Sequence, residues 1–221
     1  IASEGNAIDF GNLTDARHYG AGMSSSTRAI VAAGYDGSNA VNVIDYVEIA
    51  TLGNALDFGD TNVARRNGPG CASPTRGIFG GGLTPSKISD IQFISIASKG
   101  DSAKFGDLTK TEQGSSCGSN SIRGLFNGNS PGDGDDTIQA ITIASEGNAF
   151  DFGDMTAKKR YGSTPTSSTR AVFAGGYQTA INVIDSVEIA TTGNAVDFGD
   201  MMMPTNGAST ISDSHGGLGG Y

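Results

Sequence analysis

Residues 49–60 read Ile-Ala-Thr-Leu-Gly-Asn-Ala-Leu-Asp-Phe-Gly-Asp, and close copies begin at Ile1, Ile96, Ile143 and Ile189. We call this motif the repeat phrase. The steps between successive copies are 48, 47, 47 and 46 residues. Self-similarity at such a period is typical of propellers and solenoids, in which each unit buries its apolar face only against its neighbours. We therefore interpret residues 1–221 as one repeat domain.

The second repeat shows how one unit is built. Residues 76–82 form a short apolar run that ends in glycines, which predicts a strand running into a turn. Residues 83–89 predict a polar loop, and residues 90–97 predict a second, β-rich strand. The Gly-Asp or Gly-Asn pair of the repeat phrase predicts a tight hairpin turn.

The rest of the unit completes the pattern. Residues 102–107 predict a short strand that ends at Phe-Gly-Asp, and the small residues within 112–120 predict a tightly packed inner strand of the next unit. Four short antiparallel strands in each period are typical of a propeller blade. The phenylalanine of the phrase is expected to close the outermost strand and to pack over the glycine turn or against the neighbouring blade, where it would supply the core between blades. It stands at Phe10, Phe58, Phe105, Phe152 and Phe198.

These patterns predict an all-β fold, namely a β-propeller of about five four-stranded antiparallel blades. The chain opens with the end of a third strand and a fourth strand at residues 6–11, and it closes at residues 219–221 with the end of a second strand. We therefore expect the N- and C-terminal segments to share one blade and to close the ring. A β-solenoid is the alternative, although its coils are usually shorter.

Composition excludes several classes of function. The net charge of −9 and the pI near 4.5 argue against binding of nucleic acid. No apolar stretch is long enough for membrane insertion. Cys71 and Cys117 fall in corresponding stretches of adjacent units, which favours two separated, partly buried free thiols over a disulfide. No Cys/His metal spacing is present, and we expect no cofactor apart from the calcium considered below.

With this order of parts, the chain resembles kelch repeats. Glycine doublets stand at Gly80-Gly81 and Gly175-Gly176, and the phrase has phenylalanine where that family has tryptophan. The middle strands carry an aspartate, and a basic residue precedes each new blade. These residues are Asp45, Asp90 and Asp185, and Arg17, Arg65 or Arg66, Lys110 and Arg160. The resemblance implies the propeller fold but not one activity, because kelch propellers serve as scaffolds, ligand-binding modules and occasionally oxidases.

A narrower likeness concerns the near-identity of the copies, seen in residues 42–60 and 182–200. It resembles the kelch-like tandem repeats of structural and tail proteins of tailed bacteriophages. It implies a non-enzymatic structural or adhesive module of a virion, extracellular, with another virion protein or a host-surface glycan as partner and with an oligomeric arrangement in the particle. A cytoplasmic kelch-type interaction scaffold is the alternative. A propeller enzyme, such as a copper oxidase or a glycan-acting enzyme, is disfavoured because no cluster of reactive side chains is visible.

Two groups of charged residues are candidate sites. Asp133, Asp135 and Asp136 place three carboxylates in one loop, where they could hold calcium, although the spacing of a calcium loop is missing and a solvated turn is favoured. A basic residue also recurs eighteen residues after the phrase phenylalanine, at Arg28, Arg76, Arg123 and Arg170. These arginines could line the rim of the channel and bind an anion, but pairing with aspartates such as Asp9, Asp57 or Asp151 is favoured.

The loops that differ between units are the expected binding surface. They span residues 36–40, 83–89, 129–137 and 178–181, they join the second and third strands, and they are therefore expected on one face. Their candidate contact residues are Asp36, Asn39, Lys87, Asp133, Asp135 and Gln178. His18 and His215 are the only histidines. A hydrolytic triad of Asp15, His18 and Ser24 is disfavoured because no nucleophile turn is present.

Overall fold

The computed structural model describes residues 6–129, 134–177, 181–205 and 207, and within them the fold is all-β. Unit 1 is the sheet of β1 (Ala21–Ser24), β2 (Arg28–Tyr35), β3 (Ala40–Glu48) and β4 (Leu56–Arg65). Unit 2 is the sheet of β5 (Gly70–Ala72), β6 (Arg76–Gly80), β8 (Ser86–Ser95) and β9 (Ala103–Glu112), with β7 (Leu83–Thr84) paired to β8.

Units 3 and 4 repeat this order. Unit 3 is the sheet of β10 (Ser116–Ser119), β11 (Arg123–Asn127), β12 (Asp135–Thr142) and β13 (Phe150–Lys159). Unit 4 is the sheet of β14 (Arg170–Ala174), β15 (Val183–Glu188) and β16 (Val196–Asp200). In unit 4 the position of the first strand is occupied by two isolated antiparallel bridges, from Ser163 to Ala174 and from Thr166 to Ala171. The sheets are antiparallel and follow the chain from first to last strand, as the sequence predicts.

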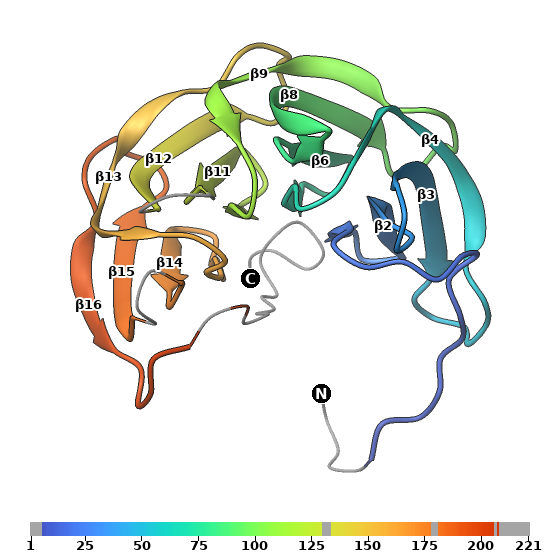
Figure 1. Ribbon diagram of the computed structural model, residues 1–221, viewed down its shortest axis with the longest axis horizontal. Coiled ribbons are helices and arrows are strands. Elements are labelled where there is room, and N and C mark those ends of the chain that lie inside the picture. The colour runs from blue at the N-terminus through green and yellow to red at the C-terminus, as the bar shows by residue number, and fades with distance from the viewer. Residues whose placement is uncertain (1–5, 130–133, 178–180, 206, 208–221) are drawn as a thin grey trace.

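The four units stand side by side in an arc (Figure 1). The second strands β2, β6, β11 and β14 lie toward the inside of the arc, and the fourth strands β4, β9, β13 and β16 form its outer side (Figure 1). This arrangement is compatible with a propeller. The shared closing blade of the sequence prediction falls on residues 1–5 and 208–221, outside the described residues. Residues 6–11, which were expected to form its outer strand, form no strand.

The small residues of the inner strands have the geometric cause that the sequence suggested. In β10, a Cβ added at Gly118 would lie 2.5 Å from the carbonyl oxygen of Thr164 in the next unit. At Gly70 in β5 it would lie 2.9 Å from the carbonyl oxygen of Gly22 in β1. Neighbouring inner strands therefore approach too closely for larger side chains.

One loop and one strand differ from the prediction. Residues 83–89 are not a loop, because Leu83 pairs with Lys87 and Thr84 with Ser86 around a turn at Pro85, so that β8 begins at Ser86. The outer strand is also longer than expected. In β9 it continues to Glu112, and Phe105 lies near its beginning rather than at its end.

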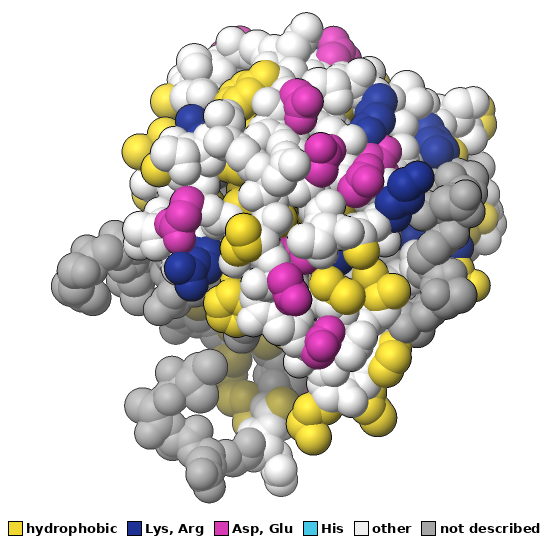
Figure 2. Space-filling view, turned by 90° about the vertical axis from the view of Figure 1, so that its left-hand side faces the viewer, with side chains coloured by type: hydrophobic (Ala, Val, Ile, Leu, Met, Phe, Trp, Pro, Cys, Tyr) yellow, Lys and Arg dark blue, Asp and Glu magenta, His cyan; other side chains and the backbone are white. Residues whose placement is uncertain are grey.

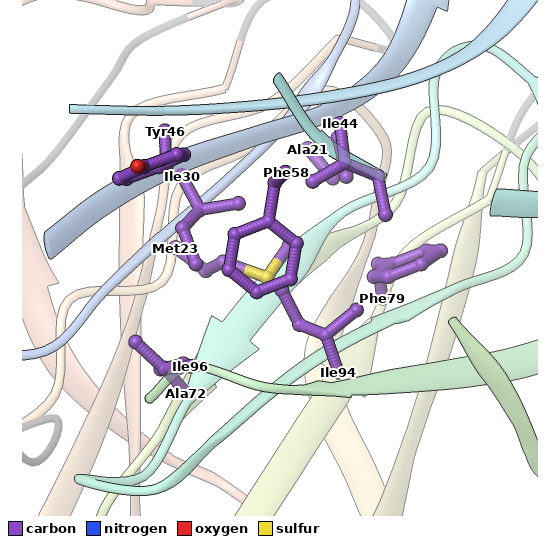
Figure 3. Close-up of a cluster of buried hydrophobic side chains, with 11 residues drawn as sticks. Ala21, Met23, Ile30, Ile44, Tyr46, Phe58, Ala72, Phe79, Ile94 and Ile96 are labelled. Atoms are coloured by element: carbon purple, nitrogen blue, oxygen red, sulfur yellow. The ribbon is translucent and has the colours of Figure 1, made fainter. Parts of the chain in front are cut away.

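The core lies between units rather than within them. One cluster joins β2, β3 and β4 of unit 1 to Phe79 and Ile94 of unit 2, with Phe58 in the middle of its side chains (Figure 3). The two other clusters join units 2 and 3 around Phe105, and units 3 and 4 around Phe152. The expectation that the phrase phenylalanine packs between blades is thus confirmed for these three residues. None of the described residues belongs to a helix that could span a membrane.

Candidate functional site

The repeat phrase forms the joint between successive units. The N–H of Gly53 donates to the carbonyl of Phe10 (2.9 Å), and the N–H of Ala55 donates to the carbonyl of Asn12 (2.8 Å). In return, the N–H of Asn12 donates to Oδ1 of Asn54 (3.0 Å). We call these three hydrogen bonds the phrase clasp. The Gly-Asn half of one phrase thereby holds the Phe-Gly-Asn half of the preceding phrase.

The clasp recurs at every described junction. The same three bonds join Phe58 and Asp60 to residues 100–102, Phe105 and Asp107 to residues 147–149, and Phe152 and Asp154 to residues 193–195. Asp101 replaces asparagine in one copy without loss, because only its Oδ1 is used as the acceptor. The Gly-Asn pair is therefore an interlocking turn between units. The expectation of a tight hairpin turn is wrong, since seven residues, 49–55, separate β3 from β4.

Backbone proximity explains the second glycine of each phrase. A Cβ added at Gly59 would lie 2.5 Å from the carbonyl oxygen of Gly100, and one at Gly153 would lie 2.3 Å from that of Gly193. Both glycines also have positive φ, 144° and 149°. No L side chain fits either demand. The near-identity of the copies thus follows from one joint that is made four times.

At the last copy, the described residues supply no partner for the clasp. Within the described residues, no Gly-Asn turn lies against Phe198, Gly199 and Asp200, and a Cβ added at Gly199 would meet nothing within 4 Å. Phe198 is 55% exposed, against 2% for Phe152. A hollow of about 560 Å³ lies beside it, lined in part by Pro165, Arg170 and Phe198. We call this surface the open edge of unit 4. Figure 2 views the molecule from the side of Figure 1 on which β16 lies and shows hydrophobic, acidic and basic side chains on that face.

The recurring arginines lie at the same junctions. Nη1 of Arg28, Arg76 and Arg123 donates to the carbonyls of Ile96, Ile143 and Ile189, at 2.8, 3.1 and 2.6 Å. Each of these carbonyls belongs to the first residue of a phrase in the neighbouring unit. Each guanidinium also lies over a ring of its own unit, those of Tyr46, Phe93 and Phe152 among them. These side chains hold units together, and none of them lines the central cavities described below.

Glutamates pair with these arginines in place of the expected aspartates. Nε of Arg28 donates to Oε1 of Glu48 (2.8 Å), and Nη2 of Arg170 lies 3.1 Å from Oε1 of Glu188. Nη2 of Arg76 lies 3.9 Å from Oε1 of Glu146. The predicted pairing of these arginines with Asp9, Asp57 and Asp151 is therefore wrong. Asp9 and Asp57 instead accept the N–H groups of Gly11 and Gly59. Binding of an anion by the arginines remains a prediction.

Each junction also contains a buried polar pair. Arg17 lies 2.9 Å from Asp45, and Lys159 lies 3.0 Å from Asp185, with all four side chains almost fully buried. Burial lowers the pKa of Lys159, while Asp185 acts in the opposite direction. Arg65 pairs with Asp90 at the junction of units 1 and 2. The sequence indicated Arg17, Arg65 and the aspartates as residues of these pairs. For units 2 and 3 it indicated Lys110 and Arg160, whereas the residues that are buried there are Glu112 and Lys159. The period of 47 residues from Arg65 leads to these two positions.

The junction of units 2 and 3 replaces the ion pair with a neutral one. Nε2 of Gln139 donates to Oε2 of Glu112 (2.9 Å), and the side chains are almost completely buried. Burial raises the pKa of Glu112 to about 8. Glu112 is therefore protonated at neutral pH. The partners thus match at the described junctions, a cation with Asp45, Asp90 or Asp185 and a neutral acid with Gln139, and such matched buried groups favour one order of units.

A chain of backbone hydrogen bonds crosses the inner ends of the units. The N–H of Asn67 donates to the carbonyl of Tyr19, and Gly114, Tyr161 and Gly207 each donate in turn to the preceding member, at 2.7–3.0 Å. All five residues have φ between 53° and 64°. Their spacing equals that of the phrases, 48, 47, 47 and 46 residues. Gly207 therefore occupies the position at which a fifth unit would begin.

Two cavities lie at the centre of the arc. One of about 450 Å³ is lined by β1, β2, β5 and β10 and by residues 164–166, and one of about 500 Å³ adjoins the inner hydrogen-bond chain. Glycine, serine, alanine and threonine dominate their walls. The titratable side chains among the lining residues are the thiols of Cys71 and Cys117 and the phenols of Tyr19 and Tyr161.

The two cysteines are free but not separated. Cys71 pairs with Ile78 in its sheet and Cys117 with Phe126, so that the two residues are offset by one position in their units. Successive side chains in a strand point to opposite faces. Cys117 therefore packs against the cluster that contains Cys71, and burial together with the Cys71 thiol raises the pKa of Cys117. The expectation of equivalent, separated positions is wrong for this reason.

The loops between second and third strands meet one another. Tyr35, Asn39 and Arg66 line a pocket of about 330 Å³ together with Leu83, Thr84 and Pro85 of unit 2. Arg66 lies over the Tyr35 ring at 4.1 Å. Nζ of Lys87 donates to Oδ1 of Asn129 of the next unit (3.3 Å). We call the surface formed by residues 35–40, 66, 83–87 and 129 the loop face.

Asp36 shapes its own loop. Its Oδ1 accepts the N–H groups of Ser38 and Asn39, both at 2.7 Å, and these bonds lower the pKa of Asp36. Asp36 therefore stays ionised and fixes the loop that presents Asn39. Gln178, the candidate contact residue of unit 4, lies outside the described residues.

The proposed calcium ligands are only partly described. Asp135 pairs with Nζ of Lys110 (2.5 Å) and accepts the N–H of Thr137. Burial acts against these bonds, yet together they lower the pKa of Asp135. Asp136 is half-buried, and Asp133 lies outside the described residues. Within residues 6–129, 134–177, 181–205 and 207, no group of three or more His, Cys, Asp or Glu side chains could hold a metal ion.

The residues of the disfavoured triad have different surroundings. The ring of His18 contacts Tyr19 and Tyr35, at centroid distances of 4.4 and 5.3 Å. Ser24 lines the central cavity, whereas Asp15 lines a pocket with Arg17 and Asp36. His215 lies outside the described residues.

Comparison with known proteins assigns no family. Neither a scan of protein-family models nor a search of curated proteins found a match.

Proposed function

We propose that this chain is a non-enzymatic structural or adhesive module, a kelch-like β-propeller that presents a binding surface on a rigid repeated frame. The observation that carries the proposal is that, within each unit, the residues that join the units are separate from the residues that vary. The nearly identical residues form the clasp and the arginine contacts between units. The residues that differ between units form the loop face, where specificity can vary without disturbing the frame.

The fold-level part of the proposal is a fifth blade. Gly207 repeats the inner position of the preceding units, and residues 6–12 supply the clasp half of an outer strand to unit 1. A blade shared by an N-terminal and a C-terminal segment would combine these two parts. It would also give the last phrase the partner that it lacks among the described residues.

The biological setting that we propose is a virion, in a tail, fibre or capsid decoration, with another virion protein or a host-surface glycan as the partner. The pocket of the loop face supports a polar ligand, because Tyr35, Asn39 and Arg66 offer a ring, an amide and a guanidinium within one recess. The net charge of −9 supports partners other than nucleic acid. No cofactor is needed for this role, and calcium at residues 133–136 remains an optional addition to the loop face.

Two experiments test this proposal. The first measures whether the protein co-sediments with purified phage particles in a density gradient; its presence in the soluble fraction of cells alone would instead support a cytoplasmic kelch-type scaffold. The second applies the protein to a glycan array beside Arg66→Ala and, as matched control, Ile122→Ser, whose side chain is 64% exposed on unit 3. Binding that Arg66→Ala abolishes and Ile122→Ser retains supports the loop face. Equal binding by all three would contradict its role.

A further inference from the structure

The two cysteines of the chain stand on the inner strands of adjacent units, and both are free thiols. Cys71 belongs to β5 of unit 2 and Cys117 to β10 of unit 3. Both side chains line the central cavity of about 450 Å³. Cys71 is a member of the apolar cluster between these units, and Cys117 packs against it. The function proposed above uses neither thiol.

The flanking junctions show how side chains at these two positions meet. The steps of 48, 47 and 47 residues between phrases make Met23 and Gly70 the counterparts of the two cysteines one junction earlier. A Cβ added at Gly70 would lie 3.2 Å from Cε of Met23. One junction later the counterparts are Gly118 and Thr164, and a Cβ added at Gly118 would lie 2.8 Å from Cγ2 of Thr164. The repeat therefore directs these two positions toward each other across the gap between units.

The junction of units 2 and 3 keeps the same register. Oγ of Ser119 accepts the N–H of Ala72 (3.2 Å) and donates to its carbonyl (2.7 Å), so the two inner strands are joined next to the cysteines. The Cys71 thiol lies against unit 3, because a Cβ added at Gly124 would lie 3.1 Å from its Sγ. Burial raises the pKa of Cys117, and the neighbouring Cys71 thiol raises it further. The two thiols therefore lie together at this junction.

We propose that Cys71 and Cys117 form a disulfide between units 2 and 3 when the folded protein meets hydrogen peroxide. The sulfur of Cys117, the less buried of the two, attacks one oxygen of the peroxide. The O–O bond breaks, the sulfur becomes a sulfenic acid, and the thiol proton leaves with the departing hydroxide as water. The sulfur of Cys71 then attacks this sulfur, the S–O bond breaks, and the hydroxide leaves with the Cys71 proton as a second water. Two thiols are thereby oxidised to one disulfide, and the peroxide is reduced to water.

The disulfide would lock the junction of units 2 and 3. It would join covalently two units that are otherwise held by packing and hydrogen bonds, and it would restrict the unfolded chain over residues 71–117. Formation should be slow at neutral pH, because the thiolate is the reactive form and burial raises the pKa of Cys117. Neither setting considered above is required. Outside a cell the bond would persist, and in a reducing cytoplasm it would be reversed.

Treatment of the folded parent chain with hydrogen peroxide tests the proposal. After removal of the peroxide, the chain is unfolded and its remaining thiols are alkylated with iodoacetamide. Mass spectrometry should show two labels before oxidation and none after it, and dithiothreitol should restore both. A tryptic digest without reduction should contain the peptides 67–76 and 111–123 linked to each other. Oxidation should become faster as pH rises from about 7 to about 9, and the melting temperature of the oxidised chain should be about 5–10 °C higher.

The matched controls are Cys71→Ser and Cys117→Ser, each of which keeps one thiol without its partner. Neither variant should give the linked peptides, and peroxide should not raise the melting temperature of either. Two labels that persist in the oxidised parent chain would overturn the proposal. So would oxidation that dithiothreitol does not reverse, or a disulfide found only between two copies of the chain. A linked chain with a lower melting temperature would show that the bond strains the junction and does not lock it.

Discussion

The same three residue types, Phe-Gly-Asp, stand at 152–154 and at 198–200, but in different surroundings. Phe152 is 2% exposed and Phe198 is 55% exposed. A Cβ at Gly153 would meet the carbonyl oxygen of Gly193 at 2.3 Å, whereas one at Gly199 would meet nothing. The difference arises from the unit that follows, not from the local sequence. The repeat phrase is thus one partner in a joint, and its burial is decided by its neighbour.

This comparison predicts opposite outcomes for one substitution at two sites. Phe152→Ala should lower the free energy of unfolding by about 3–5 kcal/mol, because it opens a cavity between units 3 and 4. Phe198→Ala should change it by less than about 0.5 kcal/mol in dilute protein, since the side chain contacts solvent. Urea denaturation followed by circular dichroism measures both. Equal losses at the two sites would show that the open edge is covered in solution.

The sequence predicted the units well because their signals are local. The apolar run before the glycines of unit 2 became β6, and the small residues within 112–120 became β10, as expected. The period also predicted that the phrase phenylalanine packs between units. It could not show that Gly-Asn clasps the preceding phrase, because a Gly-Asn pair has the same local signature in a hairpin and in a joint between units.

The candidate sites were harder to predict, because their partners are distant in the sequence. Arg123 recurs with the period, yet nothing near it in the sequence indicates that it donates to the carbonyl of Ile189. Glu112 is one of many acidic residues, and only the fold shows that Gln139 faces it in a buried junction. The offset between Cys71 and Cys117 was visible in the sequence, but its consequence required the register of two sheets.

The junction of units 2 and 3 should respond to pH in a way that the junction of units 3 and 4 does not. The pKa of Glu112 is raised from 4.5 to about 8 in the folded chain. The folded state therefore holds a proton that the unfolded state releases, and stability falls as pH rises from about 4.5 to about 8. Glu112→Gln keeps the neutral hydrogen bond to Gln139 and should remove this loss, about 3 kcal/mol at pH 7.

Denaturation of the parent chain and of Glu112→Gln at pH values from about 4 to about 9 measures this difference. This range covers the ordinary and the raised pKa of Glu112. The two curves should diverge as pH rises. Glu188→Gln is a suitable control, because its carboxylate is about half exposed. Parallel curves for the parent chain and Glu112→Gln would show that Glu112 is ionised in the folded protein.

A pair of glycines isolates the backbone contact of the clasp. Gly153 and Gly199 have nearly equal φ, 149° and 140°, so alanine carries a similar conformational cost at both. Only Gly153→Ala also forces a Cβ against a carbonyl oxygen. It should therefore destabilise the chain by about 1–3 kcal/mol more than Gly199→Ala. Thermal unfolding of the two variants measures the difference, and identical melting temperatures would contradict the close approach of the two phrases.

The smallest expected difference concerns the arginines. Arg123 donates to the carbonyl of Ile189 at 2.6 Å across a closed junction, whereas Arg170 pairs with Glu188 at a site where both side chains are about half exposed. Arg123→Ala leaves a carbonyl without its charged donor and should lower the free energy of unfolding by about 1–3 kcal/mol. Arg170→Ala should lower it by less than about 1 kcal/mol, because an exposed pair is screened by solvent. Added salt should widen the difference between the two losses of stability, because screening weakens the exposed pair of Arg170 and hardly affects the partly buried bond of Arg123. If Arg170→Ala proved the more damaging under dilute conditions, the open edge would already have a partner within the same chain.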